Sequence, residues 1–426
     1  MSRTYEAGNA RCRICARCFF ALLLLGTTTP GQIVRQHPDA SNLPLPAPSG
    51  RYAIGRQAFD WVDNAQLDQF SSAPENHREL MVYIWYPAQP STQTHYAPYF
   101  PAADELDKNP AAQEAARDTF GTNWPQIVAG SIRSHAITDA APVRARTRFP
   151  VVLFSHGSSA TTFSYTAQIE YLVSHGYVVV AIEHTDAAGL VRFPDGHVRL
   201  FRDPQSSPSS AKDPLQAMIA SAEVGTQIGA EDLRFVLDTL ARKKVPLTKF
   251  MNLNRVAAVG HSYGGTLTAR ACQIDPRIKA CISEDGEVNP VGAFFDYPDH
   301  TPIRQPFLLI EIAHSPTDPE LAHMRESRVQ WDDFLKHERE QLDSCGAGSY
   351  YILLNRPHIA HSSFSDGPIL NAAPGSTQAS IALENLLLIE KLERNFLDKS
   401  LKGEAAPLLD KTADVPPGVR VEHVGR

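Results

Sequence analysis

The sequence has no long run of basic residues, and its formal net charge at pH 7 is −7. Proteins that bind nucleic acid need a basic face or stripe, so nucleic acid is not expected as a partner. Cysteine is also scarce, with six in 426 residues, three of them within the first eighteen. Without that first segment Cys272, Cys281 and Cys345 remain. An odd number this small allows at most one disulfide and excludes a disulfide-based scaffold.

Long hydrophobic runs are missing as well. The strongest one, at 18–26, is too short to span a bilayer as a helix. Arginines precede this run, and small polar residues follow it at 27–31. This order is typical of a secretory signal, so we expect residues 1–31 to be removed and the protein to be secreted or periplasmic. An uncleaved N-terminal membrane anchor is the alternative.

The remaining chain alternates between strand and helix patterns, which predicts an α/β domain with a mostly parallel central sheet and helices on both faces. Residues 32–50 are rich in Pro, Ser and Asn and are expected to form a linker. The catalytic domain is expected at 51–400. Within it, 88–148 and 186–214 are expected to be irregular excursions near the site, and 401–426 should be a loose tail.

Strands are expected where short apolar and β-branched runs occur, and helices where apolar residues recur with helical spacing. The predicted strands are 79–87, 149–155, 177–182, 256–259, 278–283, 306–312 and 350–354. The predicted helices are 111–119, 163–174, 215–242, 266–272, 323–343 and 381–397.

Residues 260–264 read Gly-His-Ser-Tyr-Gly, a G-x-S-x-G motif between the strand at 256–259 and the helix at 266–272. This context predicts a sharp turn that holds Ser262 in a strained backbone conformation. The flanking glycines keep side chains out of the bend. The N-terminus of the following helix favours the negative charge that develops beside the hydroxyl, so we interpret Ser262 as a nucleophile.

A serine nucleophile needs a histidine base and an acid that orients the base, here in the chain order Ser, acid, His. Two histidines, His358 and His361, follow the last predicted strand, and position alone does not separate them. The candidate acids are Asp285, Asp296 and Asp318, with Asp285 and Asp318 as close rivals.

Two backbone N–H groups are expected to stabilise an oxyanion. One belongs to Tyr263, directly after the nucleophile, and the other to Ser158, in the turn after the strand at 149–155. His156 in that turn is interpreted as structural. No His-Glu-x-x-His motif occurs, and neither a metal nor another cofactor is expected.

Several short motifs occur in a characteristic order. They are Phe-Ser-His-Gly at 154–157, Ser-His-Gly-Tyr at 174–177, Glu-His-Thr-Asp at 183–186, Gly-His-Ser-Tyr-Gly-Gly at 260–265 and His-Ser-Ser-Phe-Ser-Asp at 361–366. Together they resemble the platelet-activating factor acetylhydrolase family, which are secreted and intracellular serine esterases of the α/β-hydrolase fold, related to dienelactone hydrolases and cutinases.

The resemblance favours Asp285 over Asp318, because the family places its acid shortly after the strand that follows the nucleophile. It favours His361 over His358, because the family's histidine precedes a phenylalanine by three positions, as His361 precedes Phe364.

The resemblance implies a serine carboxylic-ester hydrolase that acts through an acyl-enzyme without a cofactor, with Ser158 and Tyr263 as oxyanion donors. The expected substrate is a short-acyl phospholipid or another small ester, with transient contact to a membrane or lipid surface. Ser158 is polar where the family often has an apolar residue, and Glu284 and Glu287 crowd the acid. The alternatives are a broad-specificity carboxylesterase or cutinase-like polyester hydrolase and, outside catalysis, an inactive hydrolase-fold binding protein.

Overall fold

The computed structural model describes residues 44–70, 75–90, 96–202, 214–242, 245–288, 301–313, 336, 338–411 and 413–425. The predicted signal at 1–31, most of the linker at 32–50 and most of the helix predicted at 323–343 lie outside these residues. Within the part of the chain that is described, no helix combines the length and apolar character needed to span a bilayer.

An 11-stranded sheet carries the site, in the order β13-β12-β11-β10-β9-β5-β6-β2-β1-β4-β3. All neighbours from β6 to β12 run parallel, while β2 pairs antiparallel with β6 and β1, and β13 pairs antiparallel with β12. The strands are β1 (Ala53–Leu67), β2 (His77–Ala88), β3 (Tyr96–Pro98), β4 (Arg133–Thr138), β5 (Phe149–Ser155), β6 (Val178–Glu183), β9 (Met251–His261), β10 (Ile278–Glu284), β11 (Phe307–Ile312), β12 (Ser349–Leu354) and β13 (Val419–Val424). A separate hairpin joins β7 (Leu190–Arg192) to β8 (Val198–Leu200).

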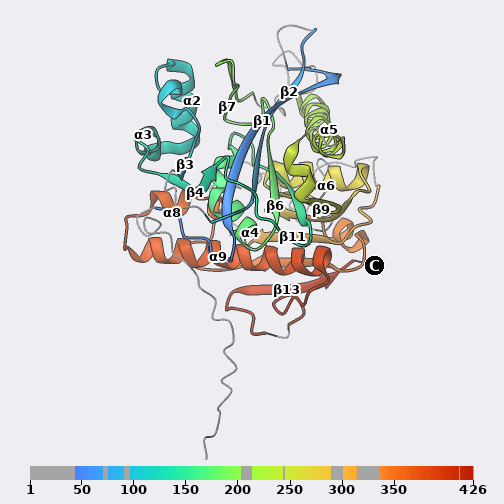
Figure 1. The fold of residues 1–426 in the computed structure, drawn as a ribbon. Helices are drawn as coiled ribbons and strands as arrows, with labels where there is room; N and C mark the ends of the chain where they lie inside the picture. The colour runs from blue at the N-terminus through green and yellow to red at the C-terminus, as the bar shows by residue number, and fades with distance from the viewer. Residues whose placement is uncertain are drawn as a thin grey trace, which may run out of the picture. The chain divides into compact units, whose positions relative to one another are not determined.

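Helices cover both faces of the sheet (Figure 1). The helices are α1 (Ala103–Leu106), α2 (Pro110–Phe120), α3 (Trp124–Val128), α4 (Thr166–Ser174), α5 (Pro214–Ala241), α6 (Tyr263–Ile274), α8 (Gly367–Asn371) and α9 (Thr377–Leu397). Shorter helical turns are η2 (Gly121–Asn123), η3 (Thr162–Tyr165), η4 (Pro246–Phe250), η6 (His361–Phe364) and η7 (Asp398–Lys402).

Alternate side chains of each central strand enter two different cores. In β5, Val152 and Phe154 join the core formed with α4 and α9, whereas Val151 and Leu153 join the core formed with α5 and α6. A parallel strand that is covered on both faces must be apolar at nearly every position, which explains the unbroken apolar character of β5 and β6. The prediction of a mostly parallel sheet between two helical layers is confirmed.

The predicted strands are all present, as β2, β5, β6, β9, β10, β11 and β12. The predicted helices at 111–119, 163–174, 215–242, 266–272 and 381–397 correspond to α2, η3 with α4, α5, α6 and α9. For α2 the local reason is clear: the Asn109 side chain accepts hydrogen bonds from Ala111 N and Ala112 N, and Pro110 occupies the first turn.

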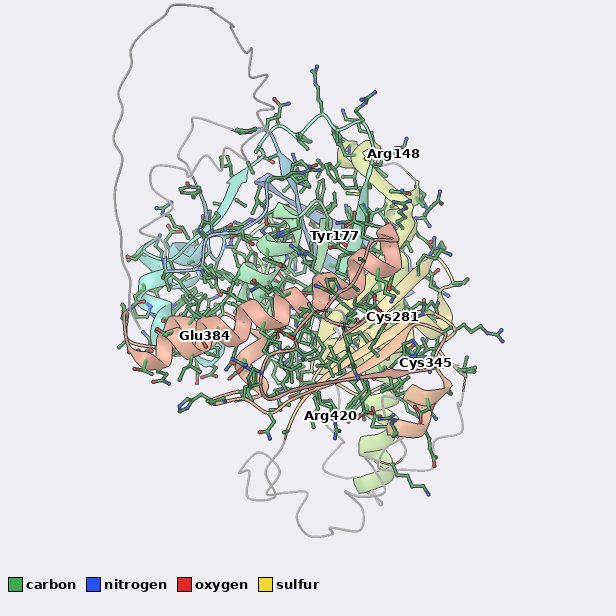
Figure 2. The ribbon with its side chains drawn as sticks, turned by 90° about the horizontal axis from the view of Figure 1, so that it is seen from below. Arg148, Tyr177, Cys281, Cys345, Glu384 and Arg420 are labelled. Atoms are coloured by element: carbon green, nitrogen blue, oxygen red, sulfur yellow. A yellow bond between two sulfur atoms is a disulfide. The ribbon has the colours of Figure 1, made fainter. Side chains whose placement is uncertain are left out.

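The segments predicted as irregular or loose contain regular structure. Besides α2, which was predicted, residues 88–148 hold α1, α3, β3 and β4, and residues 186–214 hold the β7–β8 hairpin. The tail at 401–426 forms β13, which carries Arg420 (Figure 2) and completes the sheet beside β12. The pairings of β3 with β4 and of β13 with β12 join segments far apart in the chain, so the sequence did not show these partners.

Candidate active site

Ser262 lies in the turn between β9 and α6, with φ 55° and ψ −125°. This backbone conformation is unfavourable for a residue with a Cβ atom and persists only where its surroundings hold it. A Cβ atom on Gly260 would lie 2.2 Å from Gly264 O, and one on Gly264 would lie 2.2 Å from Ser155 O. Both positions therefore require glycine. The strained turn predicted from the motif is present, with Ser262 at the N-terminus of α6.

Asp285 and His361 lie 76 residues apart in the chain and form a hydrogen bond of 2.6 Å between Oδ2 and Nδ1. Asp285 directly follows β10, and its Oδ1 accepts a hydrogen bond of 3.0 Å from the N–H of Ile312 in β11. The Asp285 side chain is 4% exposed and that of His361 is 35% exposed. A buried carboxylate thus fixes one nitrogen of a partly exposed imidazole and leaves the other nitrogen, Nε2, for a different partner.

The rival residues are placed differently. His358 is exposed and has a positive φ of 54°, in the loop three residues before His361. The alternative acids Asp296 and Asp318 lie outside the described residues. The structure therefore brings Asp285 together with His361 and leaves His358 at the surface.

Ser262 is joined to this pair through its neighbours in the chain. The Ser262 N–H donates a hydrogen bond of 2.8 Å to the carbonyl of Glu284, the residue before Asp285. The ring of His261 lies with its centroid 4.5 Å from that of His361. Ser262, Asp285 and His361 are thus gathered where β9, β10 and the loop after β12 meet, at the carboxyl ends of parallel strands.

The turn after β5 packs directly against the Ser262 turn. A Cβ atom on Gly157 would lie 3.4 Å from Ser262 Cβ and 3.3 Å from His261 Nδ1. Ser158, which follows, is exposed, and Tyr263 begins α6. The two residues predicted to supply oxyanion donors therefore lie on adjoining turns around Ser262.

The family comparison agrees with this geometry. A model of the alpha/beta hydrolase family matches residues 152–378, which include Ser262, Asp285 and His361. This chain belongs to the alpha/beta hydrolase family. A model described as platelet-activating factor acetylhydrolase, isoform II, matches residues 39–196, in the first half of the chain. The predicted resemblance to that branch of the alpha/beta hydrolases is confirmed.

Named esterases and acetylhydrolases are similar to this chain in sequence or structure. A probable 1-alkyl-2-acetylglycerophosphocholine esterase from Arthroderma benhamiae is 26% identical over 58% of this chain and 61% of its own length. The platelet-activating factor acetylhydrolase of Cavia porcellus is 23% identical over 65% of this chain and 63% of its own length. The chain thus spans about three-fifths of the length of these relatives. Among solved structures, the ferulic acid esterase of Streptomyces cinnamoneus aligns with 89% of this chain and 99% of its own at a TM-score of 0.66 and 26% identity.

Behind the Ser158 turn of this hydrolase fold, two histidines are fully buried. His156 Nε2 accepts a hydrogen bond of 3.1 Å from His184 N–H, so its proton resides on Nδ1, which donates to Gly157 O over 2.8 Å. Burial, and then the neighbouring His184, lower the pKa of His156 to about 3, so the ring is neutral. His156 therefore fixes the turn, as the sequence analysis predicts.

His184 is held by a buried ion pair that the sequence analysis missed. Its Nδ1 lies 2.9 Å from Asp232 Oδ2, and its Nε2 lies 3.0 Å from Ser155 Oγ. Asp232 in α5 also accepts hydrogen bonds of 3.0 Å and 2.8 Å from the guanidinium of Arg78. Burial raises the pKa of Asp232, but the charge of Arg78 and the hydrogen bonds from His184 and Arg78 together more than offset this, and the net pKa lies below its usual value. Among the residues that the structure describes, no group of three or more His, Cys, Asp or Glu side chains could hold a metal ion.

Asp366, in the motif that begins with His361, anchors the loop of that histidine. Its carboxylate accepts hydrogen bonds from Thr166 N at 3.0 Å, Ala167 N at 3.1 Å and the Tyr99 hydroxyl at 2.8 Å. Burial raises the pKa of Asp366 to about 8, and the hydrogen bonds from Tyr99 and the backbone act in the opposite direction. The loop 361–366, which carries His361 and is called the base loop below for the predicted role of that histidine, is thereby attached to the N-terminus of α4.

The residue before Asp285, Glu284, has a buried carboxyl group that shares a hydrogen-bonding partner with Glu393. The Gln168 amide donates to Glu284 Oε1 at 2.5 Å and to Glu393 Oε2 at 3.1 Å. Burial, and then the neighbouring Glu393, raise the pKa of Glu284 well above its usual value, and burial raises that of Glu393 to about 8. One amide thus bridges two carboxyl groups whose charged forms are disfavoured, and this bridge connects α4 and α9 to β10, the strand that ends just before Asp285.

Proposed function

We propose that this protein is a serine hydrolase of carboxylic esters that acts through an acyl-enzyme on Ser262. The hydrogen bond of 2.6 Å between Asp285 and His361, beside the strained turn of Ser262, is the observation that carries this proposal. A carboxylate bound to Nδ1 of the imidazole selects the tautomer whose Nε2 can accept a proton.

In the proposed reaction His361 Nε2 takes the proton of the Ser262 hydroxyl as its oxygen attacks the ester carbonyl carbon. The bond to the alcohol then breaks, and His361 returns the proton to the leaving oxygen. Water repeats the sequence on the acyl-enzyme and releases the acid. Asp285 remains ionised and stabilises the imidazolium, while the N–H groups of Ser158 and Tyr263 stabilise the oxyanion, each contributing on the order of 3 kcal/mol.

A short-acyl phospholipid or a small ester is the proposed substrate. The support comes from relatives named as platelet-activating factor acetylhydrolase and 1-alkyl-2-acetylglycerophosphocholine esterase, and from the family model over 39–196. The second candidate is a broad-specificity carboxylesterase or cutinase-like polyester hydrolase. The solved ferulic acid esterase, which aligns along 89% of this chain, favours that candidate.

The segment from α1 to η2 bears on substrate size under either candidate. The Thr119 hydroxyl at the end of α2 lies 3.3 Å from the carbonyl of Ser159, and the Asn123 amide in η2 donates to Asn371 Oδ1 in α8 over 2.6 Å. This segment therefore contacts both the Ser158 turn and the region after the His361 loop. We infer that it forms one wall of the acyl site.

The test is hydrolysis of p-nitrophenyl esters from acetate to palmitate, and of a short-acyl phospholipid, by the wild type and by paired variants. We expect Ser262→Ala, Asp285→Asn and His361→Ala to lose at least about 10³-fold in kcat, because each removes a member of the acyl-transfer unit. Asp318→Asn and His358→Ala serve as the matched controls and should stay near the wild type.

Each alternative has its own outcome in that experiment. Loss of activity in Asp318→Asn with retention in Asp285→Asn would reject the assigned acid. Wild-type turnover in Ser262→Ala would reject the proposed function. Absence of labelling by a fluorophosphonate would favour the inactive binding protein. Preference for acetate and the phospholipid supports the acetylhydrolase-like substrate, and equal or better cleavage of long acyl chains or polyester supports the second candidate.

We also propose that the protein is exported. The sequence pattern at 1–31 supports a signal segment, and the Cys272–Cys281 disulfide supports an oxidising compartment.

A further inference from the structure

The hydroxyl group of Tyr165 lies between two parts of the site that are distant in sequence. Its oxygen accepts a hydrogen bond of 3.1 Å from Gly157 N–H and lies 2.9 Å from His261 Nδ1. Burial raises the pKa of Tyr165, so the group keeps its proton. Because the hydroxyl has one proton and Gly157 offers a donor, that proton is donated to His261 Nδ1.

This hydrogen bond determines the state of His261, the residue directly before Ser262. Burial, and then the neighbouring His361, lower the pKa of His261 to about 3. The ring is therefore neutral, with Nδ1 as acceptor and the proton on Nε2. The centroid of the His261 ring lies 4.5 Å from that of His361 and 5.3 Å from that of Phe364, so both rings of the base loop pack against the His261 ring.

Tyr165 is itself fixed to the same loop. It ends η3, and the next two residues, Thr166 and Ala167, donate their N–H groups to the Asp366 carboxylate. The N–H of Asp366 donates to Ser164 O over 2.7 Å. The segment 164–167 is thus bound on one side to the base loop and, through the Tyr165 hydroxyl, on the other side to the Gly157 turn and the Ser262 turn.

We propose that Tyr165 is a positioning residue for ester hydrolysis, which through Gly157 and His261 sets the turn that carries the Ser158 N–H relative to Ser262. The proposal rests on the proposed function of Ser262. Gly157 N–H belongs to the His156–Gly157 peptide, which is next to the Gly157–Ser158 peptide that carries the Ser158 N–H, so its hydrogen bond restrains the direction of the neighbouring donor. Tyr165 is fully buried, and its hydroxyl acts through these two partners.

The control is Tyr177, a second fully buried tyrosine whose hydroxyl is hydrogen-bonded within the protein. Its hydroxyl donates to Asp398 Oδ1 in η7 over 2.7 Å. Tyr177 immediately precedes β6, at the edge of the sheet opposite to the carboxyl ends where Ser262 and Asp285 lie. Phenylalanine at either position retains the packing of the ring. Tyr177→Phe removes one hydrogen bond far from the site, whereas Tyr165→Phe removes the two hydrogen bonds to Gly157 and His261 within the site.

The experiment measures kcat and KM for p-nitrophenyl acetate, and the rate of fluorophosphonate inactivation, in Tyr165→Phe, Tyr177→Phe and Ser262→Ala. All rates are measured at a temperature well below the Tm of every variant. We expect Tyr165→Phe to lower kcat and the inactivation rate by roughly tenfold or more, with KM within about twofold of the wild type, because the loss concerns the transition state. Tyr177→Phe should lower Tm and leave kcat within about twofold.

Equal kcat values in Tyr165→Phe and Tyr177→Phe overturn the proposal while the proposed function stands, provided that Ser262→Ala is inactive. Turnover by Ser262→Ala overturns the proposed function itself. Should Tyr165→Phe not fold, as judged by circular dichroism, the pair His261→Asn and His261→Leu replaces it. Asparagine keeps an acceptor near the place of Nδ1, so His261→Asn should exceed His261→Leu in kcat at least about fivefold, and equal values overturn the proposal.

Discussion

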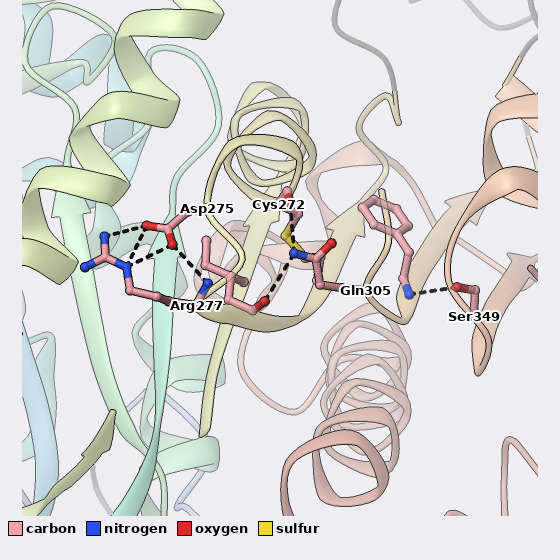
Figure 3. Close-up of a disulfide and its surroundings, with 8 residues drawn as sticks. Cys272, Asp275, Arg277, Gln305 and Ser349 are labelled. Atoms are coloured by element: carbon pink, nitrogen blue, oxygen red, sulfur yellow. Dashed lines mark hydrogen bonds and ion pairs between the residues drawn. A yellow bond between two sulfur atoms is a disulfide. The ribbon is translucent and has the colours of Figure 1, made fainter. Parts of the chain in front are cut away.

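The Cys272–Cys281 disulfide joins α6, which begins after Ser262, to β10, which ends before Asp285 (Figure 3). The two cysteines are nine residues apart in the chain. The Gln305 side chain, drawn in the same view, donates to the carbonyl groups of Cys272 at 2.9 Å and Ile278 at 3.2 Å and holds the turn between helix and strand. Removal of this disulfide tests how the frame around the site is stabilised.

The size of the effect follows from the length of the closed loop. A cross-link across nine residues lowers the conformational entropy of the unfolded chain enough to stabilise the fold by about 2.5 kcal/mol at 25 °C. The effect on catalysis should be small. Cys272 is ten residues beyond Ser262 along α6, or about 15 Å at the usual helical rise, and the Gln305 hydrogen bonds do not depend on the disulfide.

The assay is urea unfolding of the wild type with and without dithiothreitol, beside the double variant Cys272→Ala with Cys281→Ala. We expect reduction and the double variant each to lower the free energy of unfolding by about 2.5 kcal/mol, with kcat within about twofold. Cys345→Ala, which removes a buried free thiol, is the control and should keep the full response to dithiothreitol. Equal stability of oxidised and reduced protein would refute the entropic argument, and a large loss of kcat at unchanged stability would refute the separation of the disulfide from the site.

Two further predictions concern charge and export. The pKa of Glu393 is raised by burial from the ordinary 4.5 to about 8, so the folded state holds a proton that the unfolded chain releases between these values. The contribution of Glu393 to the free energy of unfolding is complete below about pH 4.5 and is lost as the pH rises to 8, at up to about 1.4 kcal/mol per pH unit. Between pH 5 and 8 the free energy of unfolding should therefore decline less steeply in Glu393→Gln than in the wild type, and the exposed control Glu114→Gln should decline as the wild type does. Identical slopes in Glu393→Gln and the wild type would contradict this. N-terminal sequencing of the mature protein should find a start after about residue 31, and an intact first segment in the membrane fraction would instead indicate the N-terminal anchor.

Sequence patterns predicted the frame of this protein because local physics dominates there. Strands such as β5 and β6 are covered on both faces, so nearly every side chain must be apolar and the pattern is unambiguous. The Gly-His-Ser-Tyr-Gly turn is equally local, since the close approaches at Gly260 and Gly264 exclude any Cβ atom.

The predicted partners of Ser262 were less accessible to sequence reasoning. Spacing left Asp285 and Asp318 as rivals and did not separate His358 from His361, and the family resemblance favoured one of each. The distance of 2.6 Å between Asp285 and His361 depends on two loops that 76 residues separate. Their roles in the reaction stay predictions until the variants are measured.

Other features had no local signal. Tyr165 and Asp366 resemble ordinary core and turn residues in the sequence, and their importance comes from which backbone groups they meet in the fold. The strand β13 does show a local pattern, Val-Arg-Val-Glu-His-Val, but only the fold shows that it pairs with the edge of β12.

The sequence by itself determined the alternating strands and helices and the strained serine turn, because hydrophobic periodicity and the need for glycine act between near neighbours. Only the tertiary structure decided which acid meets which histidine, that Cys272 pairs with Cys281, and that Glu284, Gln168 and Glu393 share a buried site. Those outcomes depend on contacts between distant segments, whose geometry is set by the packing of the whole sheet and its helices.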